Sequence, residues 1–362
     1  MIIIPYLLTF FAGSSTLFFM MKDRDPLPGF LFTALSAVTG ISITIFITFF
    51  SFAFLNRFHL LFIILAHLIY SAALLIYARP KLSLKIPRPS FPLPAIISCV
   101  FLVGILSLLY AKMYPMGGWD AWLGWNFKAR FLLLADTRWK ELFDPVFWRF
   151  HPHYPIGFPL FNAWTMAFTE GTSVFAPLAN AVLFNILTAC LLIGLLEKNC
   201  SSYFFLLPIA VIFTSPLHMI FMTNQYCDVV IGLFLLAGIG TLIEAQRRAD
   251  TRFLILCGMF LGTLSFLKLE GAVLAVLLFI GAHCYFPKPI NRKTLASFWM
   301  SALISALPMI LFLLFVAPSN QSFINGLTSA EQPSTLARLQ IVLIAPFREM
   351  ISMKWRFLWW GL

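Results

Sequence analysis

The sequence has 362 residues, of which 60% are hydrophobic and 11% are charged, and its mean hydropathy is +0.90. Soluble globular domains carry about 25% charged residues, so this composition excludes an ordinary soluble domain and indicates a membrane protein. The net charge of +11 does not indicate nucleic-acid binding, because the basic residues lie in short loops between apolar runs. That distribution is the one that sets the orientation of a membrane protein.

Apolar runs recur along the whole chain, and each predicts a membrane-spanning helix, because lipid offers backbone polar groups no other partner. We expect spans at residues 1–21, 30–55, 60–78, 93–114, 173–196, 203–222, 228–244, 253–267, 271–286 and 298–317. The first run lacks a basic leading segment and a small-residue cleavage site, so we interpret it as a retained span. The predicted fold class is an all-α polytopic transmembrane helical bundle of about 10 to 11 spans.

Basic residues gather in three of the predicted loops, which we therefore expect on the cytoplasmic side. These loops contain Arg79, Lys81, Lys85 and Arg88; Arg247, Arg248 and Arg252; and Lys288, Arg292 and Lys293. The expected location is the inner (plasma) membrane of the cell, as a multi-pass protein.

The stretch from Pro155 to Glu170 is short and is interrupted by Gly157 and Pro159. Such a segment is more often interfacial or re-entrant than spanning. We therefore predict that residues 113–173 form one long external loop of amphipathic helices that lie at the interface. Residues 224–228, residues 268–271 and the polar run that starts at Pro318 then fall on the same external side.

These observations divide the chain into three regions. Residues 1–92 are N-terminal transmembrane helices, residues 93–297 are a transmembrane module that includes the external loop 113–173, and residues 298–362 are a C-terminal helix with an external segment. The chain ends in KWRFLWWGL, which is typical of the opening of another span. We therefore expect a very short last helix or a truncated form of a longer protein.

Asp120 lies just beyond an apolar run, with Lys128 and Arg130 a few residues later. On a helix that begins near Trp119, Asp120 and Gly124 share one face with Phe127 or Lys128. A carboxylate near the bilayer surface could serve there as a general base toward a sugar or lipid hydroxyl. The alternative is an interfacial helix that is anchored by tryptophans and has Asp120 as its N-cap.

The segment HPHYP places His151 and His153 around a proline and next to Tyr154. The two histidines could bind a divalent metal ion or hold a phosphate. A third ligand at a fixed spacing is missing from the sequence, so no cofactor is assigned with certainty and a divalent metal ion stays an alternative.

Asp228 stands at the start of an apolar run, where it has either a functional role or the structural role of a helix N-cap. Lys268 and Glu270 lie in an otherwise apolar stretch, where ionisable groups are costly and usually functional. Their alternatives are snorkelling or pairing with other charges. The six cysteines lack metal spacing and are predicted to be packing residues, with a disulfide at Cys200 or Cys227 as the alternative; they are Cys99, Cys190, Cys200, Cys227, Cys257 and Cys284.

Four stretches in combination resemble the GT-C superfamily of polytopic membrane glycosyltransferases, which includes protein mannosyltransferases and bacterial lipid A or cell-envelope sugar transferases. They are GWDAWLGWNFKARFL in the first long external loop, HPHYPIGFPLFNAW after it, NQYCDVVIGLFLLAG at the start of a later span and FLKLEG beyond it. Their order and predicted side agree with the family. The resemblance covers roughly residues 93–290 and implies that the module of residues 93–297 is catalytic.

The resemblance implies a hexosyl- or pentosyltransferase that uses a polyprenyl-phosphate-sugar lipid as donor and a glycan, lipid or protein hydroxyl as acceptor. An acidic residue in the first external loop of such enzymes activates the acceptor, which displaces the lipid phosphate with inversion. In this sequence that role falls on Asp120. The resemblance also implies an active site on the non-cytoplasmic side.

For the other charged residues, the resemblance implies phosphate contacts by Lys128, Arg130 and Lys268. It implies a sugar-side or acceptor-side position for Asp228 and Glu270. His153 stands where related sequences commonly carry an acidic residue.

Two other classes of function fit the sequence. A transporter or flippase of lipid-linked glycans is one, although transporters usually place polar groups near the bilayer midplane, whereas here they lie mainly at span ends. A non-catalytic membrane scaffold is the other.

Overall fold

The structure, a computed structural model, describes residues 2–21, 27–78, 93–169, 171, 173–196, 206–285 and 292–318, and every regular element in these ranges is a helix. Six of these helices are long and apolar enough to cross a membrane. They are α1 (Ile3–Met20), α2 (Gly29–Leu55), α3 (Leu60–Ala78), α7 (Phe175–Leu196), α10 (Cys227–Arg248) and α13 (Arg292–Phe315). The all-α multi-pass bundle is confirmed at this level, but a count of 10 to 11 spans is not.

Five further helices occupy the other predicted spans. They are α4 (Leu93–Met113), α8 (Leu207–Thr214), α9 (Pro216–Thr223), α11 (Arg252–Leu267) and α12 (Leu269–Tyr285). The prediction of one span over residues 203–222 is wrong, because Ser215 is extended and separates α8 from α9. Pro216 explains the break, since proline lacks an N–H and disfavours a helical conformation in the residue before it.

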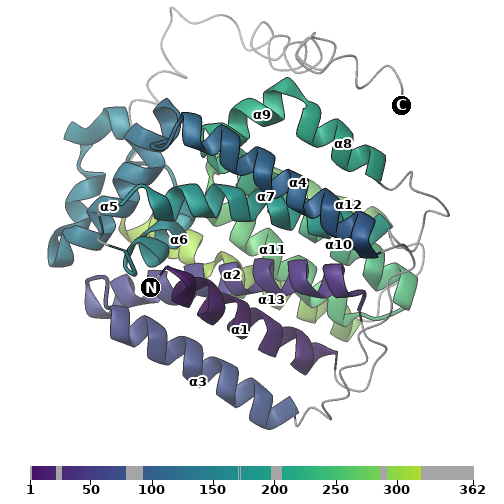
Figure 1. The fold of residues 1–362 in the computed structure, drawn as a ribbon. Coiled ribbons are helices and arrows are strands. Elements are labelled where there is room, and N and C mark those ends of the chain that lie inside the picture. Colours follow the sequence, from purple (N-terminus) through teal and green to yellow (C-terminus); the bar gives the residue numbers. More distant parts are fainter. Residues whose placement is uncertain are drawn as a thin grey trace, which may run out of the picture.

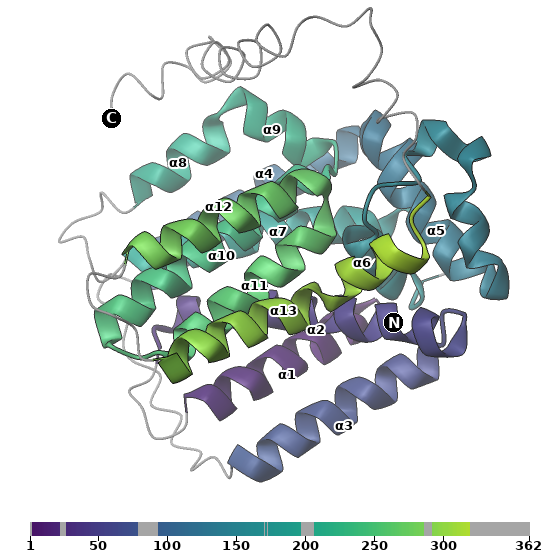
Figure 2. The same ribbon diagram turned by 180° about the vertical axis from the view of Figure 1, so that it is seen from behind.

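The long helices run along a common direction, so that their ends gather at two opposite ends of the bundle (Figures 1 and 2). One end carries residues 114–169, the α9–α10 turn, the α11–α12 turn and the C-terminal end of α13; we call it the site end. The other carries the turn between α10 and α11, with Arg247, Arg248 and Arg252, and we call it the basic end. There the buried Glu244 carboxylate pairs with Arg247 and Arg248 at 2.9 and 2.7 Å.

Small residues allow α1 and α2 to pack with their backbones almost in contact. A Cβ atom added to Gly13 would lie 1.8 Å from the Ser36 carbonyl oxygen, and one added to Gly40 would lie 1.9 Å from that of Thr9. Packing of this kind is a main source of helix association in membranes, where lipid is as apolar as the side chains. The first two helices are therefore a fixed support for the elements that pack on them.

The segment around α6 (Gly157–Met166) lies in the interior of the protein. All ten of its residues are buried, so the prediction of an amphipathic interfacial helix is wrong for this segment. Trp164 stacks on His67 of α3 with ring centroids 5.1 Å apart, and its indole N–H donates to the Thr9 hydroxyl at 3.2 Å. The polar groups of α6 thus find partners inside the bundle, which makes burial favourable.

A head-to-tail chain of hydrogen bonds joins five elements of the bundle. Each side chain donates to the next, in the order Tyr6, Asn180, Asn162, Asn126 and Gln225, over distances of 2.7, 2.8, 3.1 and 3.0 Å. The last member, Gln225 of the α9–α10 turn, donates to the Pro115 carbonyl at 3.1 Å. We call this series the amide chain; it runs from α1 through α7, α6 and α5 (Asn126–Leu134) to the site end.

Replacing Asn162 by leucine tests the amide chain. The variant Asn162→Leu removes the donor to the buried Asn126 side-chain oxygen, and an unsatisfied buried polar group costs about 1–3 kcal/mol of folding free energy. We expect a lower midpoint of thermal unfolding in detergent. Thr263→Val is the control, because the Thr263 hydroxyl donates to the Met259 carbonyl of its own helix. Equal midpoints for the two variants would contradict a structural role for the chain.

Candidate functional site

A pair of glycines after α4 brings the chain onto the α9–α10 turn. Gly117 has a φ of +76°, in the left-handed region that glycine adopts without strain. The Gly118 N–H donates to the Asn224 carbonyl at 2.9 Å, and a Cβ atom at Gly118 would lie 2.8 Å from the Tyr226 hydroxyl. The lack of side chains therefore allows the close approach that places Asp120 beside the start of α10.

The helix that carries Asp120 begins where the sequence predicts, but its first turns are wider than those of an α-helix. Residues Asp120–Trp125 form a π-helix that continues into α5. Its N-cap is Trp119 and not Asp120, so the alternative role of Asp120 as an N-cap is wrong. π-Helical turns inside helices are frequent at functional sites. Asp120, Gly124 and Lys128 all line one pocket, as the predicted common face requires.

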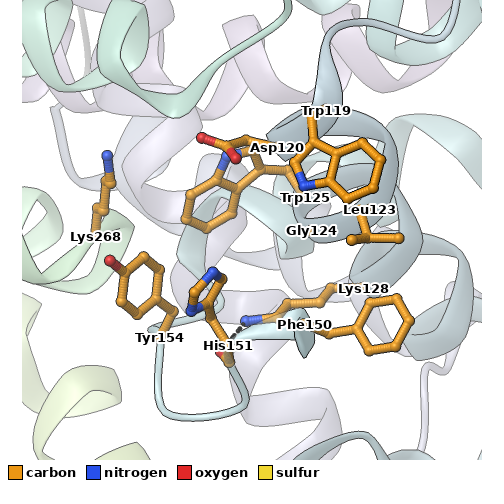
Figure 3. A pocket seen from close by; sticks show the side chains of 10 residues that line it. All are labelled: Trp119, Asp120, Leu123, Gly124, Trp125, Lys128, Phe150, His151, Tyr154 and Lys268. Atoms are coloured by element: carbon orange, nitrogen blue, oxygen red, sulfur yellow. Dashed lines mark hydrogen bonds between the residues drawn. The ribbon is translucent and has the colours of Figure 1, made fainter. Parts of the chain in front are cut away.

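This pocket lies at the site end and holds about 510 Å³ of space, part of it open to solvent. In Figure 3 the Asp120 carboxylate and the Lys268 ammonium come from different elements of the fold, and Tyr154 and His151 lie below them in this view. The full lining is Trp119, Asp120, Leu123, Gly124, Trp125, Lys128, Phe150, His151, Tyr154 and Lys268. Five of the residues singled out in the sequence therefore meet here: Asp120, Lys128, His151, Tyr154 and Lys268.

Lys268 is held by two carboxylates. Its Nζ atom lies 3.2 Å from Asp228 Oδ1 and 3.6 Å from Glu270 Oε1. Burial alone would lower the pKa of Lys268, but the two carboxylates outweigh burial and raise it. Lys268 is thus a stable cation, and its predicted pairing with other charges is confirmed. Asp228 is the second residue of α10 and not its N-cap.

Lys128 is in the opposite situation, because its side chain is only 1% exposed and has a backbone partner. Its Nζ atom donates to the His151 carbonyl at 2.8 Å and lies 5.9 Å from the ring centres of both Trp125 and Tyr154. Burial lowers its pKa from 10.5 to about 7. The Lys128 amine therefore fastens the segment His151–Pro155 to α5 at the wall of the pocket.

Two of the sequence candidates, Arg130 and His153, are not among the residues that line the pocket, whereas Tyr154 is. Arg130 is two residues after Lys128 on α5, and residues two apart on a helix point in nearly opposite directions, so the two cations do not face one phosphate together. His153 is half-buried, and burial lowers its pKa, with His151 and Lys128 adding to the effect. Burial raises the pKa of Tyr154, and Glu270 contributes in the same direction.

The described residues provide neither a metal cluster nor a disulfide. In this part of the chain no group of three or more His, Cys, Asp or Glu side chains could hold a metal ion. The rings of His151 and His153 are 5.8 Å apart and perpendicular. Cys227 is a free thiol, so the alternative of a disulfide at this residue is wrong, and Cys200 lies outside the described residues.

Sequence reasoning missed the residues that hold the pocket in place. Asn126 and Gln225 fix its helix through the amide chain, and Trp125 and Phe150 line its wall. A signal existed for Asn162 and Asn180, because an amide inside an apolar run must find a partner when it is buried.

Comparisons of the chain with models of known protein families, with curated proteins and with solved structures found no match.

Changing the pH tests the buried Lys128. Between about pH 7 and pH 8 the unfolded chain keeps a proton on this amine that the folded protein has largely lost, so the free energy of unfolding rises with pH, by up to about 1.4 kcal/mol per unit. The window ends at about pH 8 because cysteine thiols of the unfolded chain ionise above it. The pKa of His153 lies below this window, and those of Tyr154 and Lys268 lie above it. We expect the midpoint of thermal unfolding in detergent to rise across the window.

The variant Lys128→Met provides the comparison for this pH series, because it keeps the length of the side chain and removes the titrating amine. Its unfolding midpoint should change less with pH than that of the native protein. The same rise with pH in both proteins would show that Lys128 does not titrate in this range.

Proposed function

We propose that this protein is an integral membrane glycosyltransferase, which moves a sugar from a polyprenyl-phosphate-linked donor to a hydroxyl acceptor of a glycan, lipid or protein. One observation carries the proposal: an exposed carboxylate, Asp120, and a carboxylate-held cation, Lys268, share a pocket at the end of an apolar helical bundle. A donor with a lipid tail in the bilayer would present its phosphate and sugar at this depth.

In the proposed reaction, Asp120 accepts the proton of the acceptor hydroxyl. The acceptor oxygen forms a bond to the anomeric carbon of the donor sugar, and the bond from that carbon to the lipid phosphate oxygen breaks. The lipid phosphate leaves as an anion, and the configuration at the anomeric carbon is inverted. A fixed cation near the leaving group lowers the barrier, because negative charge develops there during the reaction.

Lys268 is the best placed of the cations for this leaving group. Asp228 and Glu270 keep it protonated and leave part of its side chain, 14%, exposed. The two carboxylates are themselves more exposed, at 37% and 56%, so they can accept hydrogen bonds from sugar or acceptor hydroxyls. Lys128 takes a different part in this scheme, because its amine holds the His151–Pro155 segment that forms one wall.

The short, basic α10–α11 turn supports a position of the site on the non-cytoplasmic side of the plasma membrane. Arg247, Arg248 and Arg252 lie at the basic end, opposite the pocket. Cytoplasmic loops carry an excess of lysine and arginine. The site end would then face outward, where a lipid-linked donor needs no nucleotide site.

The variant Asp120→Asn tests the proposal. In vesicles that contain the purified protein, polyprenyl-phosphate sugar and an acceptor, it should lower the transfer rate by about 100-fold or more, since a general base typically contributes 10²–10⁴-fold. Binding of the donor should persist. Asp136→Asn is the matched control, because Asp136 is an exposed carboxylate of the same loop with a 3.8 Å contact to Arg57 and lies outside the pocket; its rate should stay within about twofold of the native rate.

Two results would contradict the proposal. Undiminished transfer by Asp120→Asn would exclude this residue as the base. Movement of lipid-linked glycans across the vesicle membrane without any transfer would favour a transporter or flippase.

A further inference from the structure

Two neighbouring tryptophans at the site end are exposed to different degrees and face different surroundings. Trp119 is 67% exposed and Trp122 is 51% exposed, with ring centroids 6.0 Å apart. Trp119 lines the pocket, whereas Trp122 does not. Anchoring at the membrane interface accounts for either ring equally well, so it does not explain why one of them borders a charged pocket.

The wall of the pocket joins two kinds of surface. Aromatic rings come from Trp119, Trp125 and Tyr154, and charged groups come from Asp120 and Lys268. The face of an aromatic ring is electron-rich and attracts weakly positive C–H groups, while a carboxylate and an ammonium bond hydroxyl groups. A sugar ring offers both partners, because its C–H bonds form an apolar face and its hydroxyls form a polar rim.

Gly124 leaves space for such a ring. It lies five residues after Trp119 and lines the same pocket, and a Cβ atom added to it would meet no other atom within 4 Å. The pocket is partly open to solvent, so a sugar ring could enter beside Gly124 from outside the bundle.

We propose that Trp119 is a specificity-determining residue on whose indole face the sugar ring of the donor stacks, with the ring hydroxyls bonded by Asp120 and Lys268. This inference rests on the proposed function for the source of the sugar. It separates the roles of the two tryptophans, since Trp119 contacts the substrate and Trp122 anchors the helix at the interface.

Four variants of the full chain test the stacking. Trp119→Phe keeps an aromatic face, and Trp119→Leu keeps an apolar side chain without one. Trp122→Leu is the matched control for anchoring. Gly124→Leu fills the open space, and its own control is Gly232→Leu on α10, where an added Cβ atom also meets nothing within 4 Å.

The probes are citronellyl phosphate alone and its glucosyl, galactosyl, mannosyl, N-acetylglucosaminyl and arabinosyl derivatives. Their affinities for each variant are measured by titration calorimetry in a detergent without a sugar headgroup. We expect the native protein to bind at least one glycosyl derivative more tightly than citronellyl phosphate. Trp119→Leu should weaken that binding by about 10-fold, the size of one good aromatic contact, and should leave binding of citronellyl phosphate unchanged.

The other variants complete the expected pattern. Trp119→Phe and Trp122→Leu should stay within about threefold of the native affinity for the glycosyl derivative, which is below the effect of losing one aromatic contact. Gly124→Leu should abolish the preference for the sugar, and Gly232→Leu should retain it.

Three results would overturn the inference: no preference of the native protein for any glycosyl derivative, native affinity in Trp119→Leu, or equal losses in Trp119→Leu and Trp122→Leu. The outcome is separable from that of the proposed function. Sugar transfer with an unaffected Trp119→Leu variant would refute the stacking alone. Binding that depends on Trp119, without any transfer, would refute the transferase alone.

Discussion

The amide chain from Tyr6 to Gln225 is the interaction on which the position of the site depends. Its three central members, Asn126, Asn162 and Asn180, are buried, and a buried amide without a partner is costly. Each link therefore constrains the next, from α1 through α7 and α6 to α5 and the α9–α10 turn. The chain ends on the carbonyl of Pro115, just before the glycine pair that leads to Asp120. A hydrogen-bond network inside the bundle thus fixes the position of the segment that carries Asp120.

The two lysines at the pocket show how environment divides similar residues between different tasks. Lys268 has two carboxylate neighbours and a raised pKa, so it keeps its charge beside the opening. Lys128 is enclosed by aromatic rings, donates to a backbone carbonyl and has a lowered pKa. In the proposed function, Lys268 is therefore suited to bind the donor phosphate, and Lys128 is suited to hold the pocket wall at His151. The resemblance in sequence motifs implies phosphate contacts for both lysines. The charged neighbours of Lys268 fit this role better than the aromatic neighbours of Lys128.

Much of the fold follows from the sequence, because lipid forces long apolar runs to become helices, and nine of the runs predicted as spans each correspond to one helix. The break at Ser215 was also readable from Pro216. The interior position of α6 was not, since Asn162 and Trp164 are satisfied by partners far along the chain. The meeting of Lys268 with Asp228 was foreseeable from charges at span ends. The partner of Lys128 could not be predicted, because it is a backbone carbonyl, which every residue has whatever its side chain.

In the proposed function, one pocket between Asp120 and Lys268 receives the phosphate and sugar of a lipid-linked donor. A cryo-electron microscopy structure of the protein with polyprenyl-phosphate sugar in a lipid nanodisc would locate the donor. We expect density for the donor phosphate within about 3 Å of the Lys268 Nζ atom, a charge-assisted hydrogen bond, and density for the sugar beside Asp120. Donor density elsewhere on the bundle, with this pocket empty, would contradict it.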